Sequence, residues 1–260
     1  MKILVFVKQV PDTDDVKLDE RGNLKRDGVA SMINPLDANA VEAALRLKEK
    51  YGATVVAICM GPPQAEDVLK KALALGCDEA YLLSDRAFGG ADTLATAYTL
   101  AKGAEKVGDY DLLLFGRHAI DGDTAQTGPA TASFLNIPQI TLADSVDIQD
   151  GWVVCTRALE SRSERVRAKL PALVTVCKEI NTPRYPTLPN IMKANRKPIT
   201  VWAAADIEAD TNETGMPGSP SSTKKVFEPE KRGTDTVYFT GSVEEMAAQL
   251  VDMLENERLI

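Results

Sequence analysis

The loop G-R-H-A-I-D-G-D-T-A-Q-T-G, residues 116–128, collects residue types that suit a phosphate-bearing ligand. Its three glycines let a backbone approach a ligand closely, and Thr124, Gln126 and Thr127 offer hydroxyl and amide groups. A helix beginning near Thr124 would add backbone N–H groups that favour an anion. On composition alone, a glycine-rich connecting loop is the favoured interpretation. Neither a Walker-type G-x-x-x-x-G-K nor a G-x-G-x-x-G after the first strand is present.

Two further segments could bind a ligand or a partner. In S-D-R-A-F-G-G-A-D-T, residues 84–93, Arg86 could pair with a phosphate or carboxylate. Phe88 there either covers a planar ring or caps the core, and both interpretations stay open. In the proline-rich segment 181–194, the apolar side chains could anchor a partner at reduced ordering cost, or pack on their own domain.

Scarce residues exclude most side-chain chemistry. The chain has one histidine, His118, and four cysteines without metal-ligand or redox spacing, which excludes a His/Cys zinc site and a CxxC motif. The cysteines lie in apolar runs and are interpreted as small buried residues in a reducing compartment. The sequence therefore predicts no metal and no catalytic side chain, and assigns any difficult chemical step to a bound group.

The charge of the chain points away from nucleic acid. Its 260 residues carry a formal charge of −8, whereas proteins that bind phosphate backbones present basic surfaces. The same acidity argues against anionic lipid. The apolar run near the N-terminus has five residues between Lys2 and Lys8, too short for a signal peptide or a membrane span. We expect a cytoplasmic protein.

Strand-like and helix-like patterns alternate from residue 1 to about 128. The expected strands are 3–7, 54–60, 80–83, 110–115 and 173–177, and the expected helices are 34–52, 64–75 and 92–107. This alternation of apolar strands with helices predicts an α/β fold with a mostly parallel twisted sheet and helices on both faces. Segments 143–149, 152–159 and 163–168 read as extra antiparallel strands, with a hairpin turn at Asp150-Gly151.

The C-terminal region looks different. Residues 208–235 are polar and rich in Gly, Pro, Ser and Thr, which predicts an extended arm or linker. A closing helix is expected over 242–256, where Ser242 and Glu245 form a capping box. We expect residues 1–200 to form the sheet domain, with the segment 181–194 at its end. Residues 201–260 then form an extended arm ending in a helix.

Several long motifs in one order make the chain recognisable. It resembles the small (beta) subunit of electron transfer flavoproteins over essentially its whole length. The motifs that carry the resemblance are V-K-Q-V-P-D (7–12), N-P-L-D (34–37), G-P-P (61–63), A-L-A-L-G-C-D (72–78), G-R-H-A-I-D-G-D-T-A-Q-T-G (116–128) and P-R-Y-P-T-L-P-N-I-M-K-A (183–194).

The resemblance implies that residues 1–200 form a nucleotide (FAD)-binding domain similar in fold to the adenine nucleotide alpha-hydrolases, with a partner-recognition loop over 181–194. A heterodimer with a larger alpha subunit is implied as well. It also implies which residues bind the cofactor and which dock on a partner dehydrogenase. The implied cofactor residues are Phe6, Asn34, Pro35, Leu36, Asp37, Met60, Asp85, Arg86, Ala87, Phe88, Gly89, Gly90, Ala91, Asp92, Thr93, Thr96, Gly116, Arg117, His118, Ala119, Ile120, Asp121, Gly122, Asp123, Thr124, Ala125, Gln126 and Thr127. The implied docking residues are Arg184, Tyr185, Leu188, Pro189, Ile191 and Met192. The C-terminal helix would pack on the alpha subunit.

Residues 84–96 decide between two branches of this family. They resemble the electron-bifurcating branch, in which the small subunit binds FAD and takes hydride from NADH, and D-G-D at 121–123 agrees. Electrons would then go to ferredoxin or flavodoxin and, through an alpha-subunit flavin, to an acyl-CoA dehydrogenase-like protein. His118 and the basic segment 157–167 depart from the family pattern.

Two alternatives stay open. The first is a non-bifurcating small subunit with structural AMP. The second, from another class, is an ATP-binding regulatory protein of the stress-protein type. The segment 183–194 and the C-terminal arm count against the second alternative.

Overall fold

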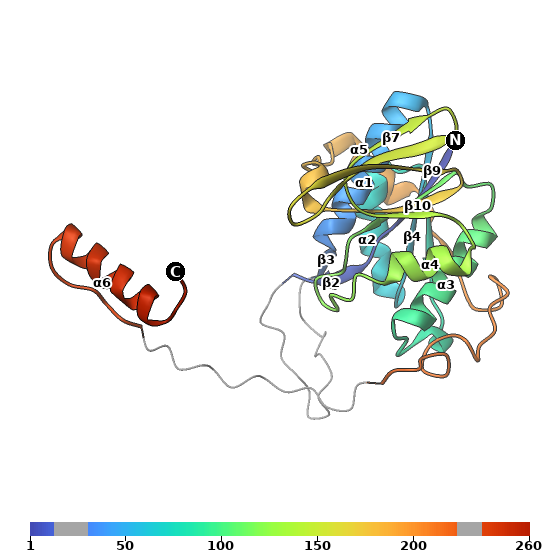
Figure 1. The fold of residues 1–260 in the computed structure, drawn as a ribbon. Coiled ribbons are helices and arrows are strands. Elements are labelled where there is room, and N and C mark those ends of the chain that lie inside the picture. Colours follow the sequence, from blue (N-terminus) through green and yellow to red (C-terminus); the bar gives the residue numbers. More distant parts are fainter. Residues whose placement is uncertain (13–30, 223–235) are drawn as a thin grey trace. The chain divides into compact units, whose positions relative to one another are not determined.

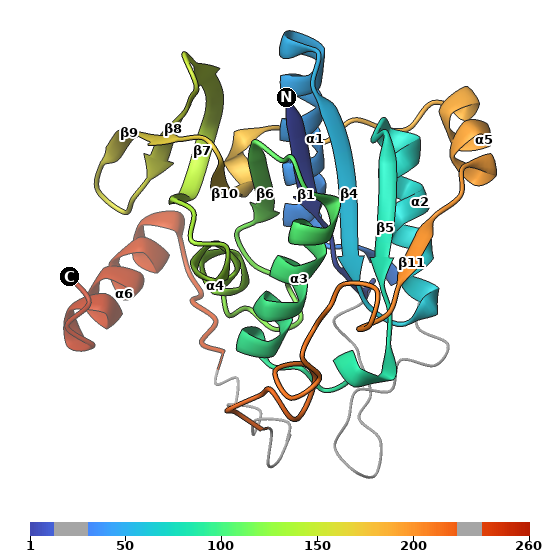
Figure 2. The ribbon, with the colours of Figure 1, turned by 90° about the vertical axis from the view of Figure 1, so that its right-hand side faces the viewer.

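A computed structural model describes residues 1–12, 31–222 and 236–260. Residues 1–224 form one compact unit and residues 225–260 a second. The first unit is built on a nine-stranded sheet in the order β11-β5-β4-β1-β6-β10-β7-β8-β9 (Figures 1 and 2). The α/β fold expected from the sequence is confirmed.

The parallel part of the sheet consists of apolar strands. These are β1 (Lys2–Phe6), β4 (Thr54–Met60), β5 (Glu79–Leu83), β6 (Leu112–Gly116), β10 (Ala172–Val176) and β11 (Thr200–Trp202). All pair in parallel with their neighbours, as strands do when helices cover both faces of a sheet. Strand β11 lies in a segment that the sequence did not mark as a strand.

An antiparallel extension follows, as expected. Strand β7 (Gln139–Gln149) pairs in parallel with β10 and antiparallel with β8 (Trp152–Ala158), which pairs with β9 (Ser163–Lys169). The predicted hairpin turn is present, because Asp150 and Gly151 have φ values of 49° and 79° between β7 and β8. A separate short ribbon joins β2 (Gln9–Pro11) to β3 (Ser31–Ile33).

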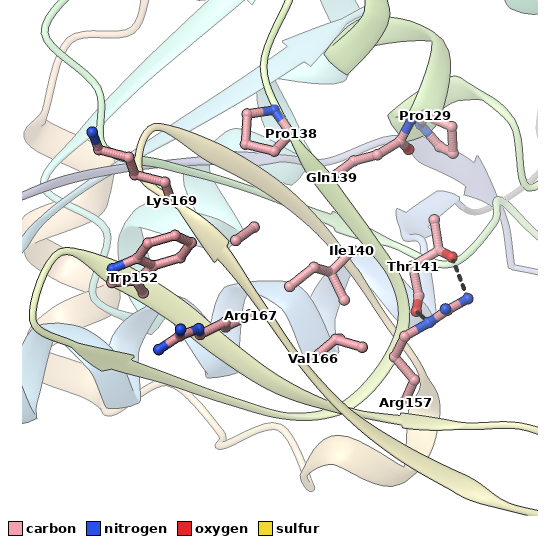
Figure 3. Close-up of a pocket in the computed structure, with 11 residues that line it drawn as sticks. Pro129, Pro138, Gln139, Ile140, Thr141, Trp152, Arg157, Val166, Arg167 and Lys169 are labelled. Carbon is pink, nitrogen blue, oxygen red and sulfur yellow. Dashed lines mark hydrogen bonds between the residues drawn. The ribbon is translucent and has the colours of Figure 1, made fainter.

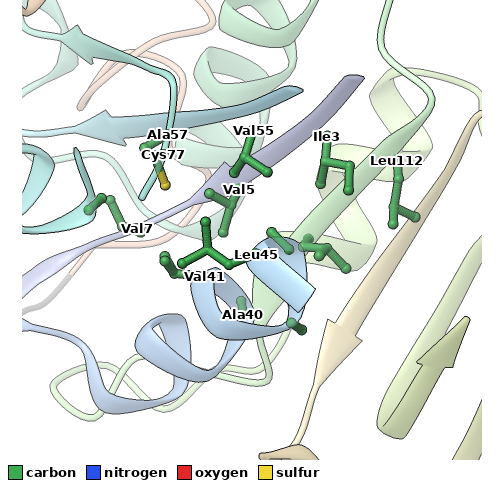
Figure 4. Close-up of a cluster of buried hydrophobic side chains, with 14 of the residues drawn as sticks. Ile3, Val5, Val7, Ala40, Val41, Leu45, Val55, Ala57, Cys77 and Leu112 are labelled. Carbon is green, nitrogen blue, oxygen red and sulfur yellow. The ribbon is translucent and has the colours of Figure 1, made fainter. Parts of the chain in front are cut away.

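Helices cover the two faces of the sheet. Helices α1 (Pro35–Tyr51) and α2 (Glu66–Leu75) pack on one face in a cluster that includes Val5, Val41 and Val55 (Figure 4). Helices α3 (Thr93–Val107) and α4 (Thr127–Phe134) pack on the other face, where Leu100 lies among buried residues. Three 3₁₀ turns, η1 (Pro63–Ala65), η2 (Arg86–Phe88) and η3 (Lys178–Ile180), complete the connections.

Two segments differ from the sequence-based expectation. The proline-rich segment 181–198 contains helix α5 (Leu188–Arg196), which begins at Thr187 with its side chain as the N-cap and Pro189 in the first turn. Residues 203–222 belong to the first unit instead of forming an extended arm, and Ala204, Ile207 and Thr214 are buried. The glycines and prolines of residues 203–222 form packed turns. A composition rich in glycine and proline does not distinguish such turns from a linker. The rest of the expected arm, 223–235, lies outside the described residues.

The second unit contains α6 (Val243–Asn256). Its predicted capping box is present, because Ser242 and Glu245 each bond the other's backbone N–H. In the part of the chain that the structure describes, no helix is both long and apolar enough to cross a membrane.

Candidate functional site

The carboxyl ends of β1 and β6 meet where the strand order changes direction, because β4 lies on one side of β1 and β6 on the other. Ligands of open α/β sheets bind at such a point. Asn34, directly before α1, bridges the start of α1 and the loop after β6. Its side-chain amide donates to the His118 carbonyl at 2.9 Å, and its Oδ1 accepts from the Ile120 N–H at 3.2 Å. The sequence predicts Asn34 as a helix N-cap, but its side chain makes no capping bond and holds the 116–127 loop instead.

Asp37 joins the segment after β1 to the end of β6. Its carboxylate accepts the Lys8 N–H at 2.8 Å and the backbone N–H of Gly116. Burial raises the pKa of Asp37 to about 7, against the opposing effect of these hydrogen bonds. A Cβ at position 116 would lie 2.4 Å from Asp37 Oδ1 and 2.7 Å from the Leu36 carbonyl carbon, so this contact requires glycine.

Lys8 contributes a contact that the sequence-based residue set omits. Its Nζ pairs with both carboxylate oxygens of Asp121, at 2.7 and 2.8 Å, and so ties the end of β1 to the loop after β6. The motif V-K-Q-V-P-D that contains Lys8 was visible in the sequence, but the partner of the ammonium group was not.

The exposed part of the 116–127 loop leads into α4. The helix begins at Thr127, three residues later than expected, and Gln126 at its N-cap makes no side-chain capping bond. No side chain of the N-cap residue therefore occupies the start of α4, and an anion could bind there, as at other helix N-termini that bind phosphate. Asp123 and Ala125 adopt positive φ values of 49° and 54° in this loop.

His118 lies at the edge of the same loop. Its Nδ1 is 3.4 Å from Asp123 Oδ1 but without hydrogen-bonding geometry. Among the described residues it is the one buried side-chain nitrogen or oxygen that lacks a partner. A polar ligand atom could satisfy it.

The second candidate loop follows β5. Asp85 accepts the Ala87 N–H at 3.0 Å and, through its other oxygen, the Ala204 N–H at 3.0 Å, and these bonds lower its pKa. Phe88 is buried in the core, as its core-capping interpretation predicts. Arg86, Gly89 and Gly90 remain exposed.

Residues 212–222 cover this loop from outside, a contact that no sequence signal indicates. Asp92 caps α3 and accepts the Ser221 hydroxyl at 2.7 Å, while its own N–H donates to Ser219 Oγ at 2.8 Å. The Met216 N–H donates to the Gly89 carbonyl at 3.0 Å. Gly215 has φ 52°, and a Cβ there would lie 2.2 Å from the Ala87 carbonyl oxygen.

The two candidate loops meet. Thr93 Oγ1 lies 3.3 Å from Thr124 Oγ1, across the gap between α3 and the loop after β6. Thr96 lies half-buried one turn further along α3, and Met60 ends β4 at the same edge of the sheet. Phe6 instead lies in the core, where its ring stacks on Phe115 at 4.2 Å, so it supports the loop from below.

The candidate docking residues lie elsewhere. Tyr185, Leu188 and Met192 are 93%, 71% and 54% exposed, on α5 and the segment before it. Pro189 and Ile191 are also exposed on α5. Arg184 differs from these residues because its guanidinium turns inward onto α1.

Two open pockets are lined by neither the candidate cofactor residues nor the candidate docking residues. One, of about 640 Å³, lies between α4 and the antiparallel strands, and its lining includes Trp152, Arg157 and Lys169 (Figure 3). The other, of about 430 Å³, lies between α3, α4 and residues 212–220. The candidate cofactor residues instead lie along an open edge of the sheet and do not enclose a cavity.

Local chemistry suits binding better than covalent catalysis. Burial raises the pKa of Cys59 and Cys77 to about 12, so neither thiol is a nucleophile near neutral pH. Within residues 1–12, 31–222 and 236–260, no group of three His, Cys, Asp or Glu side chains could hold a metal. The edge offers backbone N–H groups, hydroxyls and small residues, which fit an anionic cofactor with a planar ring.

Known proteins resemble this chain along its whole length. Residues 22–207 match the electron transfer flavoprotein domain family. An electron transfer flavoprotein subunit beta from Thermoanaerobacterium thermosaccharolyticum is 47% identical over the full length of both chains. The caffeyl-CoA reductase-Etf complex subunit CarD of Acetobacterium woodii is 46% identical, and the acryloyl-CoA reductase electron transfer subunit gamma of Anaerotignum propionicum is 40% identical, again over full lengths.

Proposed function

Because the chain belongs to the electron transfer flavoprotein family, with beta subunits among its full-length relatives, we propose that it is the small subunit of an electron-bifurcating complex. When bound, FAD supplies two-electron acceptance from NADH and one-electron transfer to two acceptors. One acceptor is ferredoxin or flavodoxin, and the other, reached through an alpha-subunit flavin, is an acyl-CoA dehydrogenase-like protein.

The observation that carries this proposal is the contact between the two loops at Thr93 and Thr124. A phosphate group suits the 116–127 loop and the start of α4, where the N-cap residue Gln126 makes no side-chain capping bond. AMP would need only this phosphate site. A second loop, with the small, exposed residues Gly89 and Gly90, meets this loop at Thr93, and a further ring would bind along that contact. The space beside Gly90 itself is taken by Met216, whose Cγ lies 2.5 Å from the position of an added Cβ.

The chain's own residues bind and orient. Asn34 and Asp37 fix the 116–121 backbone, and Lys8 holds Asp121. Arg86 lies exposed beside Gly89, where its guanidinium can pair with a phosphate or carboxylate. Residues 212–222 cover the outer side of the 85–92 loop and keep its backbone in place.

Two relatives support an acyl-CoA dehydrogenase-like partner. By their names, one is a subunit of a caffeyl-CoA reductase complex and the other an electron transfer subunit of acryloyl-CoA reductase. We further propose that the exposed apolar residues of α5 dock on such a partner, and that residues 225–260 with α6 pack on the alpha subunit.

Cofactor stoichiometry tests the proposal. The complex with its alpha subunit is purified, its cofactors are released by denaturation, and flavin and AMP are quantified by chromatography. We expect two FAD per heterodimer. One FAD together with one AMP would identify the non-bifurcating alternative, and a colourless complex with bound ATP would identify the regulatory one.

A kinetic assay gives an independent readout. We expect NADH oxidation to require ferredoxin and an enoyl-CoA with its reductase together, and to stop when either is omitted. NADH oxidation that proceeds with the enoyl-CoA arm alone at the same rate contradicts bifurcation.

A further inference from the structure

The segment before α5 is attached to α1 at two places. At the first, the Asn39 side-chain amide donates to the carbonyl and Oδ1 of Asn181, at 2.8 and 3.0 Å. The Asn181 amide donates back to the Asn39 carbonyl at 3.0 Å. Asn39 is buried, so these bonds are shielded from water and fix the position where the chain leaves the sheet.

Arg184 makes the second attachment. Its Nε donates to Glu42 Oε2 at 2.7 Å, and its Nη2 donates to Glu49 Oε2 at 3.1 Å. Glu42 and Glu49 lie about two turns apart on one side of α1, so a single guanidinium spans both carboxylates. The Arg184 backbone N–H also donates to Glu42, at 3.3 Å. These three groups are called the Arg184 clamp below.

Charge and burial differ between the two carboxylates of the clamp. Burial raises the pKa of the Glu42 carboxyl, but hydrogen bonds from Arg184 and Arg46 outweigh it and leave that pKa below its ordinary value. The hydrogen bond from Arg184 likewise lowers the pKa of Glu49. A buried carboxylate that loses one partner is costly, whereas an exposed ion pair is worth little. The Glu42 half of the clamp should therefore matter more than the Glu49 half.

The residues around the clamp point outward. Tyr185, Leu188 and Met192 are largely exposed, while Ala194 is buried at the other end of α5. The backbone of residue 184 is fixed on α1 one residue before Tyr185 and four before Leu188. Fixing position 184 thus sets the direction from which the apolar side chains are presented.

We propose that Arg184 is a positioning residue that orients the docking helix α5 through Glu42 and Glu49 and does not itself contact the partner. This inference rests on the proposed function, in which α5 docks on an acyl-CoA dehydrogenase-like protein. It assigns to the partner an apolar recess for Leu188 and Met192 and no carboxylate for Arg184. The benefit is preorganisation, because an anchor already held in place loses less entropy on binding.

The test uses the complete complex with its alpha subunit, in the variants Arg184→Gln, Arg184→Lys, Glu49→Gln and Arg184→Gln/Glu49→Gln. Arg46→Gln is the matched control, because Arg46 also pairs with Glu42, at 2.8 Å, but contacts no residue of the 181–196 segment by hydrogen bond or ion pair. The first readout is hydrogen exchange of residues 187–196. The second is KM and kcat with a purified acyl-CoA dehydrogenase that oxidises the wild-type complex.

We expect Arg184→Gln to speed hydrogen exchange across 187–196 and to raise KM for the dehydrogenase about tenfold, with kcat at saturation and flavin content unchanged. Arg184→Lys should give exchange rates and a KM between those of wild type and Arg184→Gln, because one ammonium cannot span both carboxylates. Glu49→Gln should raise KM less than Arg184→Gln, and the double variant should add nothing further. Arg46→Gln should resemble wild type in both readouts.

Two results would overturn the clamp. A raised KM with unchanged exchange would make Arg184 a direct contact, and faster exchange with an unchanged KM would remove its role in docking. A wild-type complex that reduces no acyl-CoA dehydrogenase speaks against the proposed function itself and against docking through α5, while the exchange data still show whether Arg184 fixes the helix.

Discussion

At the scale of single residues, a buried carboxylate and a glycine join the two sides of the candidate cofactor edge. Asp37 accepts backbone N–H groups from Lys8 and Gly116, which follow or end two different strands. Asp37 and Gly116 stand in motifs that were visible in the sequence. The contact between them was not visible, because they are 79 positions apart and only the fold brings them together.

Gly116→Ala should therefore destabilise the protein and deplete its cofactor. The added Cβ would lie 2.4 Å from Asp37 Oδ1 and 2.8 Å from the Asp37 nitrogen, neither of which can retreat without moving α1. We expect a loss of at least about 2 kcal/mol in the free energy of unfolding, measured by denaturant titration. Gly122→Ala is the control, because nothing lies within 4 Å of its Cβ position. Equal stability of the two variants would contradict the close contact.

Asp37 also predicts a pH dependence of stability. Burial raises its pKa to about 7 in the folded protein, above its value of 3.8 in an unfolded chain, so the folded state binds the proton more tightly. Its contribution to stability is fully present below about pH 4 and is lost as the pH rises through about 7. Relative to Asp37→Asn, the free energy of unfolding should fall by up to about 1.4 kcal/mol per pH unit in that window.

The measurement is chemical unfolding of both proteins at intervals from pH 4.5 to pH 8. The comparison with Asp37→Asn removes the contributions of the other carboxylates. A difference between the two proteins that stays constant with pH would show that the Asp37 carboxyl titrates near its ordinary value.

At the scale of elements, the periodicity of the sequence predicted the strands and helices whose formation depends on local sequence pattern. The parallel strands, α1 with Pro35 in its first turn and Gly52 at its end, and the capped α6 follow from alternation and capping residues. Strand β11, helix α5 and the packed segment 203–222 did not follow, because each is stabilised by distant partners. Ala204, for example, donates to Asp85 across 119 residues.

Helix α5 carries a prediction of its own. Leu188→Ala should raise KM for the acyl-CoA dehydrogenase, because an exposed apolar anchor is lost from the proposed interface; such anchors are worth about 2 kcal/mol or more. Flavin content should stay normal, since α5 does not contribute to the cofactor edge. The control is Val201→Ala, an exposed apolar residue on β11. Loss of flavin in Leu188→Ala would refute this division between docking and cofactor binding.

At the scale of the whole molecule, the first compact unit extends to Lys224, beyond the boundary at residue 200 expected from composition. Residues 201–222 belong to it by their hydrogen bonds to Asp85, Gly89 and Asp92. The second unit presents exposed apolar side chains on α6, among them Val243, Leu250 and Val251. Such a helix needs a partner to cover its apolar residues.

Ending the chain after Lys224 should separate folding from assembly. We expect the truncated chain to keep the thermal transition of the first unit and to bind the alpha subunit much more weakly in a titration. Leu250→Ser and Val251→Ser in the full chain should weaken binding in the same direction. Undiminished binding by the truncated chain would contradict the proposed packing of α6 on the alpha subunit.

The hydrogen bond between Asp92 and Ser219 spans 127 residues. During synthesis at roughly 5–20 residues per second, the loop after β5 emerges about 6–25 s before the segment that covers it. Through this interval the contacts of Asp92 with Ser219 and Ser221, and of the Gly89 carbonyl with Met216, are not yet made. The loop after β5 is thus among the last parts of the first unit to be completed, so we expect the candidate cofactor edge to be ready only after residues 212–222 have been synthesised.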